Sequence, residues 1–307
     1  MTTQAKELAK PDVATRSFTE RALPYILSLP ALLLMIGILY PFFTGMYWSF
    51  TDYNLASGTE KQWVGLTNYI DMVKDPEFWN SLRVTLQYTL ICLAIELPLG
   101  LAVAMVLQKE FWSVRFFRAV LIMPLMMPPV VAALMWKVMM ANDGVYNYLL
   151  GLLGIPPIQW LGSMQWSLWS VCLIDIWIYT PFVALIFLAG LQSLPREPYE
   201  ASMVDGASAL YVFRRLTLPL LTPFIILVTV FRGIDALKIF DIIYATTQGG
   251  PVNATMSLHI SAYYVGIRWM NFGPGMAYLI VLWAICYGIC FYLVKVWTRS
   301  VQRATGY

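Results

Sequence analysis

Four charged residues interrupt an apolar stretch in the last third of the chain. The stretch reads F-R-G-I-D-A-L-K-I-F-D and places Arg232, Asp235, Lys238 and Asp241 three residues apart with alternating sign. On a helix, residues at i and i+3 are neighbours, so opposite charges in this row can pair. Charged groups inside a membrane are costly and indicate internal pairing or a polar path. Two interpretations stay open: a ladder that holds helices together, or side chains that line the route of a solute.

Two acids in earlier apolar runs could join this row. Glu96 lies just before Pro98, and Asp175 lies within D-I-W-I-Y-T-P-F. Either carboxylate could pair with Arg232 or Lys238, because an unpaired charge in an apolar run is strongly disfavoured.

The residues that follow Asp175 offer chemistry that suits a hydroxylated solute. Aromatic faces and a hydroxyl group are supplied by Trp177, Tyr179 and Thr180. Aromatic side chains pack on apolar faces, and a hydroxyl group forms hydrogen bonds, a combination that suits sugar rings. In an apolar segment such residues also serve as ordinary packing, so both interpretations remain.

The sequence gives little support for a catalytic site or a metal site. The chain has one histidine, and its cysteines all fall in apolar runs, where thiols behave as small apolar residues: Cys92, Cys172, Cys286 and Cys290. Neither a metal-ligand spacing nor a nucleophile elbow is present in the sequence. We therefore expect no catalytic residue, no metal site and no enzymatic activity.

A polar segment between two apolar runs carries the strongest pattern of the chain. It reads E-A-S-M-V-D-G-A-S-A-L-Y-V-F-R-R-L-T-L-P over residues 200–219. Pro195 and Pro198 favour the first turn of a helix, and Gly206 permits a tight turn. Asp205 can cap a second helix over residues 207–216. The sequence predicts a helix–turn–helix hook that inserts into another protein.

The side chains of this hook fit that purpose. Small residues would let the element sit deep in a groove: Ala201, Ser202, Gly206 and Ala207. Phe213 would supply an apolar anchor, and Pro219 begins the next apolar run.

The composition indicates which elements position these residues. Hydrophobic residues form 59% of the 307 residues, charged residues form 12%, and mean hydropathy is +0.66. The apolar runs are long enough to cross a hydrocarbon core of about 30 Å as helices. We predict an all-α polytopic membrane protein with six transmembrane helices, at about 24–49, 84–107, 115–140, 166–192, 218–246 and 273–297.

Proline and loop residues add local expectations. Pro98, Pro181 and the group Pro124, Pro128 and Pro129 should distort the second, fourth and third spans. Asp75-Pro76-Glu77 should start a helix that runs into the second span. A further helix is expected within residues 142–165, at the membrane surface, either as an interfacial anchor or as a docking surface for an external partner.

Orientation follows from the distribution of Lys and Arg in short loops. The richer set of loops holds Lys6, Lys10, Arg16, Arg21, Lys109, Arg115, Arg118, Arg196, Arg214, Arg215, Lys295, Arg299 and Arg303. These loops, both termini and the hook are therefore expected in the cytoplasm. The net charge of +3 reflects this asymmetry and does not indicate nucleic acid. The predicted organisation is a cytoplasmic segment 1–23, a transmembrane domain 24–298 with the hook at about 193–219, and a tail 299–307.

The hook resembles the EAA loop of permease subunits of bacterial ABC importers, whose pattern is E-A-A-x-x-D-G-A, then F, then L-P. The matching residues are Glu200, Ala201, Asp205, Gly206, Ala207, Phe213, Leu218 and Pro219, with Ser202 in the third position. Three further stretches are similar to the carbohydrate-uptake branch of these permeases: A-G-L-Q-S-L-P, V-G-L-T-N-Y and T-Q-G-G-P-V-N-A-T. The branch includes permeases for maltose-like sugars, glycosides, polyols and glycerol 3-phosphate.

The resemblance implies a type I importer permease fold and a division of labour. The loop would act as a coupling helix on two cytoplasmic ATPase subunits, which use ATP and Mg. A second permease, in a heterodimer, would complete the alternating-access path, and an extracytoplasmic solute-binding protein would deliver the sugar or sugar-like solute. This chain lacks the phosphate-binding loop G-x-x-x-x-G-K-[ST], so it should hold no cofactor itself.

The resemblance also places the chain in the bacterial inner membrane, surrounded by lipid. The competing hypothesis is a stand-alone secondary transporter or channel coupled through buried carboxylates such as Glu96 or Asp175. It allows the span count but gives no reason for the hook.

Overall fold

The computed structural model describes residues 18–58, 61–109 and 112–305, and helix dominates them. Within these ranges the only β-type pairings are two isolated bridges, Thr51 with Trp63 and Asn54 with Asn271. Five helices are long and apolar enough to cross a membrane, and a bent helix pair gives a sixth candidate. The all-α membrane architecture is thereby confirmed. The predicted basic cluster at Lys6, Lys10 and Arg16 lies outside the described residues.

The first candidate span forms a unit of its own that ends at Trp48. Its helix α1 covers Phe18–Trp48, and its membrane-compatible part is Leu23–Trp48. The bounds agree with the span predicted at about 24–49.

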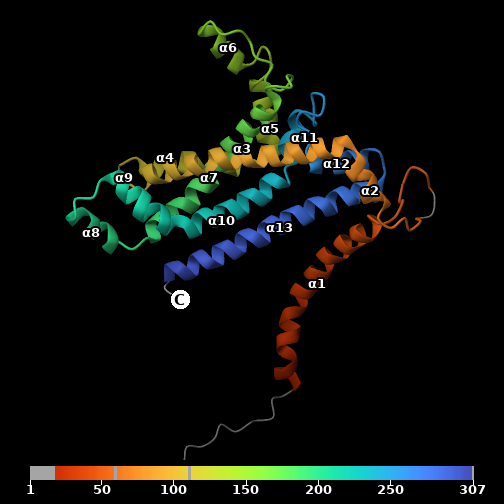
Figure 1. The fold of residues 1–307 in the computed structure, drawn as a ribbon, viewed down its shortest axis with the longest axis horizontal. Helices are drawn as coiled ribbons and strands as arrows, with labels where there is room; N and C mark the ends of the chain where they lie inside the picture. The colour runs from red at the N-terminus through yellow and green to blue at the C-terminus, as the bar shows by residue number, and fades with distance from the viewer. Residues whose placement is uncertain (1–17, 59–60, 110–111, 306–307) are drawn as a thin grey trace, which may run out of the picture. The chain divides into compact units, whose positions relative to one another are not determined.

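Four long helices form the frame of the second unit, residues 49–307. They are α3 (Pro76–Leu107), α7 (Ser167–Ser193), α10 (Leu218–Leu237) and α13 (Phe272–Thr305). Helix α3 packs against α7 and α10, and α10 packs against α13 (Figure 1). A Cβ atom at Gly100 would lie 2.5 Å from the Val183 side chain, so glycine permits the close approach of α3 and α7.

The third span is broken. Helix α4 (Val114–Ile122) and a short 3-10 turn (Pro124–Met126) meet α5 (Pro129–Met139) at a bend of 96°. The distortion predicted for the third span at its proline group is therefore confirmed, and the span predicted at about 115–140 consists of two helical parts. Proline lacks an amide hydrogen and forces the preceding residue into extended backbone, so the Pro128-Pro129 pair ends the helix. By contrast, α3 and α7 continue through Pro98 and Pro181.

The fifth span has the expected extent but not the expected continuity. Helix α9 (Ala209–Val212), a π-helical turn (Phe213–Thr217) and α10 follow one another without a break. The chain then leaves helical geometry after Leu237 and resumes it in α11 (Asp241–Thr246). The hook begins with α8 (Glu197–Val204).

Short helices connect the frame elsewhere. Helix α2 (Thr67–Lys74) precedes α3, and the Asp75 side chain accepts a hydrogen bond of 2.9 Å from the Glu77 amide, which confirms the predicted helix start. Helix α6 (Val145–Leu152) confirms a helix within 142–165. Helix α12 (Leu258–Tyr263) continues into a π-helical turn (Tyr264–Arg268) before α13. In Figure 1, α8 and α9 lie at one end of the long helices, and α2 and α12 lie at the other.

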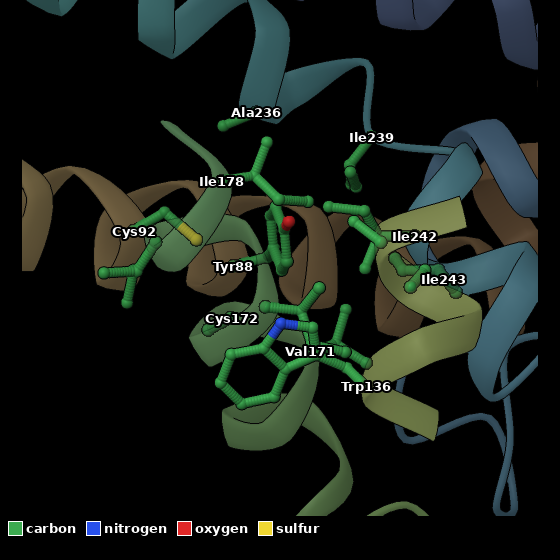
Figure 2. Packing of buried hydrophobic residues seen from close by; sticks show 14 of the residues in the cluster. Tyr88, Cys92, Trp136, Val171, Cys172, Ile178, Ala236, Ile239, Ile242 and Ile243 are labelled. Atoms are coloured by element: carbon green, nitrogen blue, oxygen red, sulfur yellow. The ribbon is translucent and has the colours of Figure 1, made fainter. Parts of the chain in front are cut away.

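The largest apolar cluster joins α3, α5, α7 and α11. Figure 2 shows Tyr88, Cys92, Cys172 and Trp136 packed together in it. Burying one such side chain stabilises the folded state by about 1.5–3 kcal/mol relative to its exposure to water. The cluster fixes the relative positions of α3 and α7, which carry the buried acids.

Candidate functional site

Three helices each contribute one charged side chain to a buried ion-pair cluster. Arg232 of α10 donates from Nε to Glu96 Oε2 at 2.8 Å and from Nη2 to Glu96 Oε1 at 3.0 Å. Its Nη2 also donates to Asp175 Oδ2 at 2.6 Å. All three side chains are at most 1% exposed. Both acids singled out from the sequence therefore meet the same guanidinium group.

The cluster links its three helices through ion pairs and hydrogen bonds. The two-pronged contact with Glu96 matches the planar guanidinium geometry, and the Cζ atom of Arg232 lies 4.0 Å from the centre of the Tyr179 ring. Removing one member of such a set leaves a charge buried without its partner. The geometry favours the ladder interpretation for Arg232, because no face of the guanidinium is open to a solute.

The Cys92 thiol lies beside this cluster. Its sulfur and one oxygen each from Glu96 and Asp175 lie within 4.8 Å of one another. A cation among these three groups would compete with Arg232, whose guanidinium already bonds both carboxylates. We therefore treat Cys92 as part of the apolar packing around the ion pairs.

The remaining charges of the row are exposed. Asp235 and Lys238 are 55% and 52% exposed, with Asp235 oxygens 3.9 Å from Arg232 Nη1 and from Lys238 Nζ. Asp241 follows the break and starts α11, where a carboxylate suits the helix N-terminus. The prediction that all four charges share one continuous helix is wrong at Asp241.

The break has a local cause that the sequence pattern did not reveal. The backbone oxygen of Lys238 accepts a hydrogen bond of 2.8 Å from His259 Nδ1, so α12 satisfies a carbonyl that a longer helix would use internally. His259 also packs near the Phe240 ring, with centroids 5.1 Å apart. The only signal in the sequence that could have singled out His259 is that it is the one histidine of the chain.

A pocket of about 380 Å³ lies beside the break. Its lining includes four of the predicted path residues and one missed residue: Tyr179, Asp235, Lys238, Asp241 and His259. Two other predicted path residues lie in packing instead. Trp177 meets Trp136 edge-on at 5.7 Å, and Thr180 is 7% exposed.

The hook is a helix, a turn and a second helix, as predicted. The turn depends on Gly206, whose φ of +66° lies in the left-handed region. Asp205 ends α8, whereas Ser208 caps α9 by accepting from the Tyr211 amide at 3.4 Å. The prediction that Asp205 caps the second helix is wrong, because Gly206 and Ala207 still belong to the turn.

The predicted contact residues of the hook differ in exposure. Glu200, Ala201 and Pro219 are exposed, whereas Ser202 is buried and donates its hydroxyl to the Tyr199 carbonyl at 2.7 Å. Phe213 is only half-buried, within the π-helical turn. The exposed apolar residues are others: Met203, Val204, Leu210 and Tyr211, at 72%, 89%, 59% and 57%.

Two hollows flank the hook. One, of about 580 Å³, is lined by Tyr199, Glu200 and Met203 together with the end of α7. The other, of about 720 Å³, is lined by Ala201, Asp205 and Ala207. Within the described residues Glu200 has no ion-pair partner. The hook thus presents an acid, small residues and apolar side chains around the turn at Gly206.

Comparison with known proteins identifies relatives across most of the chain. The model of a family described as the binding-protein-dependent transport system inner membrane component matches residues 96–303. A trehalose/maltose transport system permease protein, MalF, from Thermococcus litoralis is 34% identical over 91% of this chain and 95% of its own length. A sulfoquinovosyl glycerol transport system permease protein, SmoG, from Agrobacterium fabrum is 37% identical over 87% of each chain.

Solved structures agree in fold. A chain of a bacterial ABC transporter involved in the import of the acidic polysaccharide alginate superposes with a TM-score of 0.80 at 20% identity. The match covers 92% of this chain and 97% of that chain. A second structure of a bacterial alginate ABC transporter, in complex with an alginate pentasaccharide-bound periplasmic protein, gives a TM-score of 0.78 at 20% identity, over 90% of this chain and 94% of that chain.

Proposed function

This chain belongs to the family of binding-protein-dependent transport system inner membrane components, and we propose how its parts carry out that role. It is a permease of an ABC importer for a sugar or sugar-like solute. The family and its relatives favour this function over a stand-alone secondary transporter or channel. The proposal concerns the hook, the intramembrane charges and the missing subunits.

The hook couples this permease to a separate ATPase. The observation that carries this assignment is the exposed surface of the hook: Glu200 forms no ion pair with any described residue, and Val204 and Leu210 are exposed. Large exposed apolar side chains around an acid are typical of a protein interface. Glu200 would meet a basic group of the ATPase, and the turn at Asp205 and Gly206 would fix the angle between the two helices.

The intramembrane residues divide into two roles. Glu96, Asp175 and Arg232 hold α3, α7 and α10 together. The pocket that includes Tyr179, Asp235 and Lys238 lines the solute path. Charged side chains in the same pocket as an aromatic ring can bond sugar hydroxyls, while the ring packs on the sugar's carbon–hydrogen surface.

Other subunits complete the machine. A second permease supplies the other half of the path, two ATPase subunits bind ATP and Mg, and an extracytoplasmic solute-binding protein delivers the cargo. The proposed location is the bacterial inner membrane, with the hook and both termini in the cytoplasm. In the structure the hook and the C-terminal end of α13 lie at the same end of the second unit, which supports their placement on one side (Figure 1).

The test measures ATP hydrolysis by the assembled importer with its solute-binding protein. Glu200→Lys should abolish solute-stimulated hydrolysis, because it reverses a charge at the proposed interface, while membrane insertion stays intact. Asp143→Lys is a matched control, because it reverses an exposed acid outside the hook and outside the pocket beside Lys238. Stimulation that persists in Glu200→Lys would remove the coupling role. Uphill uptake by this chain reconstituted alone would remove the importer assignment.

A further inference from the structure

A second polar pocket lies at the end of the helices opposite the hook. Its volume is about 460 Å³, within the range of small-molecule sites. The start of α3, the loop after α11, α12, its π-helical turn and the start of α13 enclose it. None of its lining residues lies in the pocket beside Lys238, so the two are separate sites.

Several polar side chains of this pocket have no partner among the residues that the structure describes. The Glu77 carboxylate and the side-chain amides of Gln248 and Asn253 form no hydrogen bond or ion pair with any described residue. A carboxylate accepts hydrogen bonds, and each amide both donates and accepts. These groups suit the neighbouring hydroxyl groups of a saccharide, which donate and accept in turn.

Aromatic rings provide the other half of sugar recognition. Trp269 is 57% exposed, and the Tyr264 ring lies beside it with centroids 6.4 Å apart. Tyr278 also lines the pocket. An exposed aromatic face at a polar pocket can pack on the carbon–hydrogen face of a sugar ring.

The loop that carries the amides is held in a fixed shape. Asn80 donates to the Asn253 carbonyl at 3.0 Å, and the Tyr264 hydroxyl donates to the Gln248 carbonyl at 3.2 Å. Gln248, Val252 and Asn253 all have φ between +47° and +59°. Residues other than glycine rarely adopt such positive φ values, and a β-branched residue with one is an outlier. Surrounding contacts must therefore impose this backbone conformation. A preformed site loses less freedom when a ligand binds.

We propose that this pocket is an outer binding site for a neutral saccharide of one or two rings, where cargo rests before it enters the path. The inference rests on the proposed function, which supplies the sugar and the sidedness. Charge decides between sugar classes. Among the described residues the lining includes Asp75 and Glu77 and no Lys or Arg, so uronic, sulfonated or phosphorylated sugars would meet repulsion.

The experiment uses the assembled importer in spheroplasts, with Val252→Cys as a reporter. Val252 lines the pocket and is 80% exposed, whereas three of the four native cysteines are buried. A membrane-impermeant thiol reagent should label the new cysteine from outside. Saturating maltose or trehalose should slow the labelling, and a uronic-acid disaccharide should not.

A second measurement avoids any change at the reporter position. Saturation-transfer NMR should detect maltose or trehalose on the unmodified importer, without its solute-binding protein. Trp269→Ala should weaken that binding about three- to tenfold, the loss expected for one aromatic contact. Trp63→Ala, an exposed tryptophan outside the pocket, should leave the sugar affinity unchanged.

The outcomes separate this site from the importer function. Absence of both protection and NMR signal with either sugar overturns the site, even if ATP-driven sugar uptake is intact. Protection by the solute-binding protein alone, without sugar, overturns it in favour of a protein docking surface. Failure of sugar uptake with sugar protection intact would instead remove the transport assignment and keep the site.

Discussion

The ion-pair cluster and the hook are both conspicuous in the sequence, yet the folded chain treats them in opposite ways. Arg232 finds both of its acids inside the chain and is 1% exposed. The hook leaves Val204 89% exposed and Glu200 without an ion pair among the described residues. The cluster is complete within one chain, whereas the hook leaves its acid and its apolar side chains available for the partner that we propose. Polar residues in a membrane protein therefore indicate function only after their internal partners are known.

The largest effect is expected where the internal set is broken. Arg232→Ala leaves Glu96 and Asp175 buried without a positive charge, which should destabilise the protein by about 3–5 kcal/mol. Thermal unfolding of the purified importer measures the change. Lys238→Ala, at a 52% exposed position of the same row, should leave the unfolding temperature nearly constant. Equal shifts for the two variants would contradict the distinction drawn between them.

An intermediate effect is expected at the exposed face of the hook. Val204→Asp should weaken association with the ATPase by about 1.5–3 kcal/mol, because an apolar side chain no longer leaves water there. Co-purification at graded ATPase concentration measures the loss. Leu55→Asp changes an exposed apolar residue in a different loop and should leave the association intact. A hook that tolerates Asp at Val204 would not use this face for docking.

The smallest effect compares two glycines that both have room for a Cβ atom but differ in backbone geometry. A Cβ atom meets nothing within 4 Å at either Gly206 or Gly151, but only Gly206 has a positive φ. Gly206→Ala should therefore destabilise the folded conformation of the hook by about 1–2 kcal/mol. Gly151→Ala, inside α6, should be neutral or stabilising by about 0.5–1 kcal/mol. ATPase stimulation by transported solute should fall in the first variant alone.

Long-range composition predicted much of this molecule. Apolar runs fixed the membrane class and the extents of α3, α7 and α13, because burial in lipid depends on length and hydropathy. The Asp75 helix start and the Gly206 turn were also predictable, since each depends on neighbours within a few residues.

The misses share a different cause. The prolines predicted a distortion of the third span but not its angle of 96°. The end of α10 at Leu237 depends on a hydrogen bond from His259, a contact that no short pattern specifies. The partners of Arg232 are Glu96 and Asp175, which lie 136 and 57 residues away along the sequence. The sequence named both candidates, but only the packing of α3, α7 and α10 shows that both bind at once.

The unbroken passage from the hook into α10 has a mechanical consequence. Residues Ala209 to Leu237 form one helical rod through the π-helical turn, about 43 Å long at 1.5 Å per residue. In the proposed coupling role, such a rod would act as a lever that is moved from the hook. A tilt of about 5° imposed at Ala209 would swing the Leu237 end by about 4 Å over that length. The π-helical turn at Phe213–Thr217 would determine how much of that displacement reaches Leu237 and how much is taken up by bending of the turn itself.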